Sequence, residues 1–152
     1  MRTITSVDDA VQAIGAELGT SGWLEIEQDR IDLFADVTRD HQWIHVDVDR
    51  AAAESPYGAT IAHGFLTISL IPGLSKETYR IEGAKMGINY GLNKVRFLSP
   101  VTAGSRLRLH SQLIDATPVG ENAVNLTVRH TLEIDGTEKP AAVADLIARF
   151  IF

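Results

Sequence analysis

The order of apolar and polar residues divides the chain into a helical first half and a second half of long strands. Beyond about residue 79, apolar side chains alternate with polar ones, most clearly over residues 106–116 and 122–134. This two-residue period is typical of antiparallel strands that have one face in the core and one in water. The pattern predicts long strands over residues 84–97, 106–116, 122–134 and 141–152, joined by turns that contain proline or glycine.

In the first half, apolar residues recur at helical spacing between residues that favour helix ends. Ser6 is expected to cap a first helix whose apolar face extends to Leu18. Asp29 is expected to cap a second helix after a short strand, and Asp47 a short third one. Residues 39–44 show no regular period, so a loop is expected there.

The segment from Gly64 to Leu74 is apolar on almost every side. Such a segment is typical of a helix enclosed by protein all round, and Pro72 should kink it or end its first part. Helices first and a meander of strands later favour an α+β domain in which an antiparallel sheet curls around this buried helix. Since no linker or repeat interrupts the pattern, residues 1–152 are expected to form a single domain.

Composition narrows the range of functions. The chain of 152 residues suffices for one core, and the absence of cysteine excludes disulfides and thiolate metal sites. A net charge of −6 with scattered basic residues argues against binding to nucleic acid or to an anionic membrane. The N-terminus does not resemble a signal peptide, and the longest apolar stretch is too short to span a bilayer, so a cytoplasmic protein is expected. The expected partner is a small molecule or another protein chain.

The stretch from Phe34 to Phe65 concentrates reactive groups, including three of the five histidines. Asp40 and His45 lie close together across the expected loop, so their side chains can converge on one water molecule. A carboxylate and an imidazole that share a water can remove one proton and deliver another, if a dry site moves their pKa values toward neutrality. The pair suits addition or removal of water, although a turn cap and a surface histidine would give the same spacing.

His63 and Gly64 are the second candidate group. Gly64 opens the expected buried helix, where its backbone N–H is open to approach and the helix dipole favours negative charge. A carbonyl oxygen that gains charge in a reaction could be stabilised there. Alternatively, Gly64 allows close packing and His63 is a hydrogen-bonded core residue.

The histidines also suggest a metal site as an alternative. His41 and His45 have an i, i+4 spacing, and Asp40 and Asp47 lie nearby. A helix would be needed to place both histidines on one face, and this segment lacks a helical pattern. Because no second pair of ligands with this spacing occurs, no metal is expected.

Three segments together resemble a known family: FADVTRDHQWIHVDVDRAA, then TIAHGFLTISL, and later NKVRFLSPVTAGSRL. They are similar to those of the MaoC-like dehydratases, which are (R)-specific enoyl-CoA hydratases of the hot-dog fold. The resemblance covers nearly the whole chain in the expected order. The Asp, the His and the small residue of the family's hydratase motif correspond to Asp40, His45 and Ala51 here.

The resemblance implies a sheet wrapped around a central helix, and a homodimer in which two sheets join edge to edge. It also implies that Asp40 and His45 hold the catalytic water and that the Gly64 N–H binds the thioester carbonyl. The substrate would be a trans-2-enoyl thioester of coenzyme A or an acyl carrier, hydrated reversibly to an (R)-3-hydroxyacyl thioester without a metal or redox cofactor. The residues expected to contact that substrate are Gln42, Trp43, His63 and Phe65.

The chain departs from the family pattern around Asp40 and in the central helix. Arg39 stands where a Gly usually precedes the Asp, and Gln42 and Trp43 stand where Asn and Pro usually follow it. Gln42 retains an amide with a longer reach, whereas Trp43 inserts a large ring that could line or narrow the acyl pocket. Pro72 stands where some members have a Ser that assists the carbonyl. These positions bear on which acyl chain fits.

Two other functions would use the same features. A hot-dog thioesterase would need a carboxylate or a comparable group on or near the central helix, and residues 64–75 contain no Asp or Glu. A non-catalytic module would bind the acyl thioester without hydrating it, because a fold alone does not fix a function. The thioesterase is therefore ranked well below hydration, and the binding module stays an alternative because the residues around Asp40 differ from the family pattern.

Overall fold

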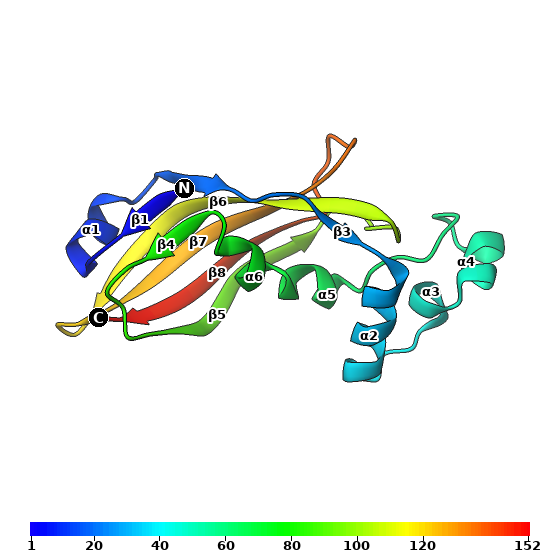
Figure 1. The fold of residues 1–152 in the computed structure, drawn as a ribbon, viewed down its shortest axis with the longest axis horizontal. Helices are drawn as coiled ribbons and strands as arrows, with labels where there is room; N and C mark the ends of the chain where they lie inside the picture. Colours follow the sequence, from blue (N-terminus) through cyan, green and yellow to red (C-terminus); the bar gives the residue numbers. More distant parts are fainter.

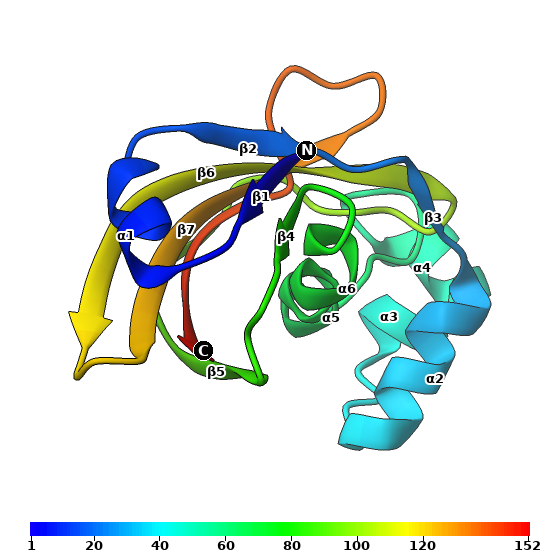
Figure 2. The ribbon, with the colours of Figure 1, turned by 60° about the vertical axis from the view of Figure 1, so that its left-hand side comes forward.

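A curved antiparallel sheet forms the body of the molecule in the computed structural model, which describes all 152 residues (Figure 1, Figure 2). Its long strands are β5 (Met86–Phe97), β6 (Ser105–Val119), β7 (Ala123–Ile134) and β8 (Ala142–Ile151). Two short strands, β2 (Glu17–Thr20) and β3 (Leu24–Ile26), pair with β6. The order across the sheet is β2-β6-β7-β8-β5, so β5 forms one edge. The predicted strands are confirmed to within a few residues.

Short helices make up most of the remaining structure. They are α1 (Val7–Gln12), α2 (Gln28–Thr38), α3 (Trp43–Val46), α4 (Val48–Glu54), α5 (Gly64–Ser69) and α6 (Ile71–Ser75), and β1 (Arg2–Ile4) pairs in parallel with β4 (Tyr79–Ile81). In Figure 2, α5 and α6 lie within the curve of the sheet. In Figure 1, α2, α3 and α4 project beyond one end of it, and we call residues 28–54 the helical arm. The predicted α+β hot-dog architecture is confirmed.

The core has two parts, both on the inner face of the sheet. Under α5 and α6, Leu66 and Ile71 pack in one cluster with Leu107, Leu109 and Leu132. Under α1 and β1, a second cluster contains Ile4, Ala10, Leu18, Leu113 and Leu126. Burial of each large apolar side chain contributes roughly 1.5–3 kcal/mol, so the sheet and the inner helices stabilise one another.

The first helix is shorter than its apolar pattern predicts. It ends at Gln12, and Leu18 lies in β2 instead of on the helix. Gly15 adopts a left-handed conformation with φ 88°, which L side chains rarely reach, and turns the chain toward the sheet. Its N–H donates to the carbonyl of Leu113 at 2.7 Å, so pairing with β6 replaces further helix.

Two of the three predicted helix caps are confirmed. Ser6 accepts a hydrogen bond from the Asp9 N–H, and Asp47 accepts one from the N–H of Arg50. The expected cap at Asp29 is wrong, because α2 begins at Gln28 without a side-chain cap, so Asp29 lies within its first turn. The loop expected over residues 39–44 is also shorter, since Trp43 begins the single turn of α3.

The central apolar segment forms two helices rather than one. It breaks at Leu70, and Pro72 lies in the first turn of α6, which confirms the predicted interruption. The expected burial on all sides is wrong for the single chain, because Phe65 is 73% exposed while Leu66 beside it is buried. One side of the segment therefore faces away from the core. None of the helices has the length and apolar character needed to cross a bilayer.

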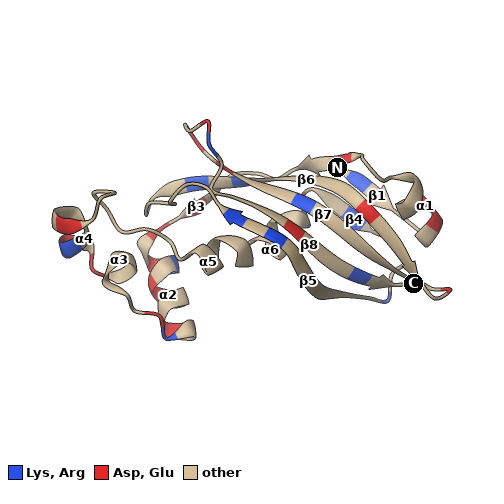
Figure 3. Ribbon diagram, turned by 180° about the vertical axis from the view of Figure 1, so that it is seen from behind, with Lys and Arg blue, Asp and Glu red and all other residues tan.

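Charged residues of both signs are interspersed along the strands (Figure 3). The guanidinium of Arg108 donates twice to Glu133, at 2.7 and 3.0 Å, and that of Arg129 donates twice to Asp145, each at 2.8 Å. These hydrogen bonds are the main reason why the pKa values of Glu133 and Asp145 are lowered. Because each pair joins neighbouring strands, the charges favour the observed register.

Candidate active site

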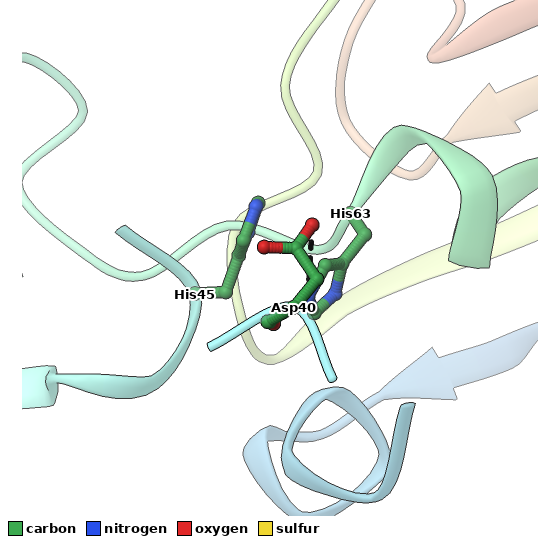
Figure 4. A group of neighbouring side chains, drawn as sticks. All are labelled: Asp40, His45 and His63. Carbon is green, nitrogen blue, oxygen red and sulfur yellow. Dashed lines mark hydrogen bonds and ion pairs between the residues drawn. The ribbon is translucent and has the colours of Figure 1, made fainter. Parts of the chain in front are cut away.

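Asp40, His45 and His63 come together where the helical arm meets the start of α5 (Figure 4). One nitrogen or oxygen atom of each side chain lies within 4.8 Å of the others. The residues come from the end of α2, from α3 and from the segment that precedes α5. The structure thus brings together three of the residues predicted from the sequence, although it does not test their roles.

Asp40 is placed by the way in which α2 ends. Arg39 adopts a left-handed conformation with φ 62°, and it is the only residue other than glycine with a positive φ. This conformation turns the chain, and the Asp40 N–H closes the helix by donating to the carbonyl of Ala35 at 3.1 Å. The Asp40 carboxylate is 56% exposed and accepts one long hydrogen bond, of 3.4 Å, from the Gln42 N–H. It is therefore available to bind a water or a substrate.

The imidazole of His45 is oriented by a backbone carbonyl. His45 is only 7% exposed, and its Nδ1 lies 2.7 Å from the carbonyl oxygen of Ile61. Since a carbonyl can only accept, the proton is assigned to Nδ1, which leaves a lone pair on Nε2. Burial lowers the pKa of His45, against the raising effect of the Ile61 hydrogen bond, so the ring is neutral near pH 7.

His63 lies deeper than His45 and contacts both other members of the group. Its Nε2 donates to the backbone carbonyl of Asp40 at 2.9 Å. Its ring stacks on that of His45, with centroids 3.8 Å apart, and lies 4.9 Å from the ring of Phe34. His63 is 3% exposed, and its buried Nδ1 has no hydrogen-bond partner.

Gly64 is the first residue of α5, so its N–H has no acceptor within the helix. A Cβ at this position would lie 3.0 Å from two ring carbons of Phe97, at the end of β5. Glycine therefore permits the close approach of the aromatic ring. Phe97 was not identified from the sequence, because the two residues are far apart along the chain. Phe65 follows Gly64 and points away from the core.

Gln42 and Trp43 lie on the helical arm next to the proposed site. Gln42 is exposed, and Trp43 is half-buried with the guanidinium carbon of Arg50 4.3 Å from its ring centroid. This stacking gives the indole a partner within the arm. Contact of Gln42 and Trp43 with a substrate remains a prediction.

Gln28 connects the segments that carry the site, although no sequence pattern indicated it. Its side-chain amide donates to the backbone carbonyl of His45 at 2.7 Å and accepts a hydrogen bond from the Thr60 hydroxyl. These contacts connect α2, α3 and the segment before α5. A glutamine at the start of an amphipathic helix carries no local signal for such a role, so only the tertiary structure identifies it.

The three side chains are a poor fit for a metal ion. The nitrogen of His63 that is nearer the Asp40 carboxylate carries the proton donated to the Asp40 backbone. The His45 and His63 rings are stacked with an interplanar angle of 24°, so their lone pairs do not converge on one point. Of the other candidates, His41 pairs with Asp36 and Asp47 caps α4.

A cavity of about 610 Å³ lies at the opposite end of the central helices. It opens between α6 and the inner face of β5 and β8, and its walls include Pro72, Ser75, Leu146, Ala148 and Phe150. Pro72 lies eight residues after Gly64, beyond the break between α5 and α6. The cavity and the polar site therefore lie near the two ends of the same helical segment.

Comparisons with known proteins show the family and the fold of the chain. A family model described as the MaoC like domain matches residues 9–134. The chain is 51% identical over 99% of its length, and 99% of the relative's, to 3-hydroxyacyl-thioester dehydratase Z of Mycobacterium tuberculosis. It is 47% identical to Nodulation protein N of Rhizobium leguminosarum bv. viciae, over 93% of this chain and 89% of that one. An (R)-hydratase of A. caviae involved in PHA biosynthesis superposes with a TM-score of 0.70 at 19% identity, over 89% of this chain and 94% of that one, which shows a shared fold.

Proposed function

The chain belongs to the MaoC-like dehydratase family, and from that premise we propose that it hydrates trans-2-enoyl thioesters to (R)-3-hydroxyacyl thioesters and catalyses the reverse dehydration. The name of the dehydratase from M. tuberculosis supports the substrate class. The observation that carries the proposal is the pairing of the Asp40 carboxylate with a neutral His45 beside the open N–H of Gly64. These groups can supply the base, the proton shuttle and the donor to the carbonyl oxygen for addition of water to a polarised double bond.

Asp40 and His45 act together on one water molecule. The carboxylate and Nε2 of His45 are both acceptors, so a water between them can donate one hydrogen to each. Its oxygen then attacks the β-carbon of the enoyl group while Asp40 accepts the proton. That proton passes through Nε2 of His45 to the α-carbon, and the site returns to its starting charge.

The thioester carbonyl accepts a hydrogen bond from the N–H of Gly64. Attack at the β-carbon moves negative charge onto this oxygen, and a fixed donor placed there stabilises the transition state more than the substrate. We expect the acyl chain to point along the central helices toward the cavity lined by Pro72 and Ser75, which is separate from the polar site.

Hydration of crotonyl-CoA by the purified protein tests the proposal. We expect the enoyl absorbance to fall and the product to have R stereochemistry. Release of free thiol from acyl-CoA would indicate a thioesterase instead. Tight binding of acyl-CoA without any change in the enoyl absorbance would indicate a non-catalytic binding module.

A small side chain at Gly64 should weaken binding of the thioester oxygen. In Gly64→Ala the new methyl group must displace the Phe97 ring. The methyl group and the displaced ring then crowd the backbone N–H of residue 64. We expect a loss in kcat of roughly tenfold, less than the roughly 100- to 1,000-fold loss seen when an oxyanion donor is removed, because the N–H is crowded but retained. Combining Gly64→Ala with Phe97→Ala should restore part of the rate. Unchanged kcat in Gly64→Ala would contradict the role of this N–H.

The homodimer is also part of this proposal, supported by the edge strand β5. This strand pairs only with β8, and most of its residues are exposed. Its exposed apolar side chains are Met86, Ile88, Tyr90, Leu92 and Phe97. A long edge with unpaired backbone groups and apolar side chains favours pairing with another strand, and a second copy of β5 supplies one.

Light scattering at micromolar concentration should give the mass of a dimer for the natural protein. Tyr90→Lys combined with Leu92→Lys should shift the mass to that of the monomer, because two charges per strand would be buried at the joined edges. Val11→Lys, on the exposed side of α1, is the control and should leave the dimer intact. A monomeric natural protein would contradict pairing through β5.

A further inference from the structure

His63 contacts both proposed catalytic residues, yet its own side chain is buried in the protein. It lies between the rings of Phe34 on α2 and His45 on α3. Its side chain is 3% exposed, against 56% for that of Asp40. A group with this burial has little surface to offer a substrate, so its contacts with the protein decide its role.

The first contact fixes the backbone of Asp40. On one side, the Asp40 N–H donates to the carbonyl of Ala35, and on the other, its carbonyl accepts from Nε2 of His63. Both polar backbone groups of Asp40 are therefore held, while the carboxylate accepts a long hydrogen bond from the Gln42 N–H and lies 4.0 Å from Nε2 of His63. The main chain of Asp40 is thus held by two hydrogen bonds, while its carboxylate is 56% exposed.

The second contact fixes the ring of His45. The edge of this ring is held by the carbonyl of Ile61, and one face is covered by His63, two residues further along the same segment. The Ile61 N–H in turn donates to the carbonyl of Ile44 at 3.0 Å, next to His45. One short segment thus sets both the direction and the plane of the His45 imidazole.

We propose that His63 is a positioning residue, which holds Asp40 by its N–H and His45 by its ring so that both side chains meet one water molecule. This inference rests on the proposed hydration. It replaces the substrate contact that the sequence suggested for His63 with an indirect role. Its Nε2–H is occupied by the Asp40 carbonyl, and its other nitrogen is buried, so neither nitrogen serves the substrate.

Two substitutions separate the contribution of the His63 ring from that of its Nε2–H. His63→Phe keeps a flat ring against His45 but removes the donor to Asp40. His63→Gln keeps an amide donor near the place of Nε2 but removes the ring. His130→Gln is the matched control, because His130 is also a buried histidine but hydrogen-bonds to Ser111 in the sheet.

We expect kcat for crotonyl-CoA hydration to fall roughly tenfold to a hundredfold in His63→Phe, since small displacements of reacting groups have effects of this size. KM should change less than about twofold, and His63→Gln should retain more of kcat than His63→Phe. His130→Gln should keep kcat per folded molecule, although its melting temperature falls. Unchanged kcat in His63→Phe, a loss confined to KM, or an equal loss in His130→Gln would overturn the inference.

Nitrogen NMR of the histidine rings gives a readout that does not depend on activity or on the folding of a variant. In the natural protein, His63 should carry its proton on Nε2 and His45 on Nδ1 at neutral pH. The opposite tautomer at His63 would overturn the inference. A natural protein without hydratase activity would instead contradict the proposed function, and the tautomers would still decide whether His63 holds Asp40.

Discussion

Asp40→Asn should lower the rate of crotonyl-CoA hydration at least ~100-fold, because the amide cannot accept the proton of the attacking water. The change preserves size and leaves an oxygen for the hydrogen bond from the Gln42 N–H, so the loop should keep its conformation. His45→Gln should cause a loss of similar size, since the amide cannot shuttle a proton at neutral pH. Turnover is measured by enoyl absorbance, and folding by circular dichroism.

Asp36→Asn is a suitable control for Asp40→Asn. Asp36 lies near the end of α2, four residues before Asp40, and hydrogen-bonds to His41, but this pair is exposed and outside the proposed site. Its replacement should change kcat by less than about twofold. Hydration at nearly the natural rate in folded Asp40→Asn or His45→Gln would rule out the proposed assignment of base and shuttle.

Acidification should destabilise the protein through His130, which is fully buried. Burial lowers the pKa of His130 to about 4, from an unfolded value of 6.5. Between these values the unfolded chain binds a proton that the folded chain excludes, so the free energy of unfolding falls as pH decreases from about 6.5 to 4. This pKa shift corresponds to a loss of about 3 kcal/mol in the free energy of unfolding. The loss levels off below pH 4, where His130 is protonated in both the folded and the unfolded state.

Urea unfolding over a series of pH values checks this expectation. His130→Gln should have a smaller slope between pH 6.5 and 4.5, because the neutral amide does not titrate and can still bond to the Ser111 hydroxyl. The remaining slope reports other groups, including His45, whose pKa is also lowered. Below this window, protonation of Asp145 and Glu133 destabilises both proteins alike. Equal slopes in the two proteins would mean that His130 does not control acid stability.

The sequence was most informative where the deciding contacts are local. Alternation located the four long strands because each side chain of a strand faces either the core or water. The caps at Ser6 and Asp47 depend on residues only three positions away. The end of the first helix was missed because Gly15 turns the chain to pair with β6, nearly a hundred residues later.

The candidate site shows the same limit. The spacing of Asp40 and His45 suggested a shared water, and the structure places both beside His63. The support from Gln28 and the ring of Phe97 could not be predicted, because these contacts join segments distant in sequence. The exposure of Phe65 contradicts the expected burial for a related reason: its side of α5 has no covering element within one chain.

The left-handed conformation of Arg39 has an energetic consequence. A residue with a Cβ loses about 1 kcal/mol in this region of φ and ψ, whereas glycine, usual at this position in the family, does not. The folded protein tolerates this strain at the residue directly before the proposed catalytic base. Part of the stability supplied by the hydrophobic core therefore offsets the strain at Arg39, which forms the turn that leads into Asp40.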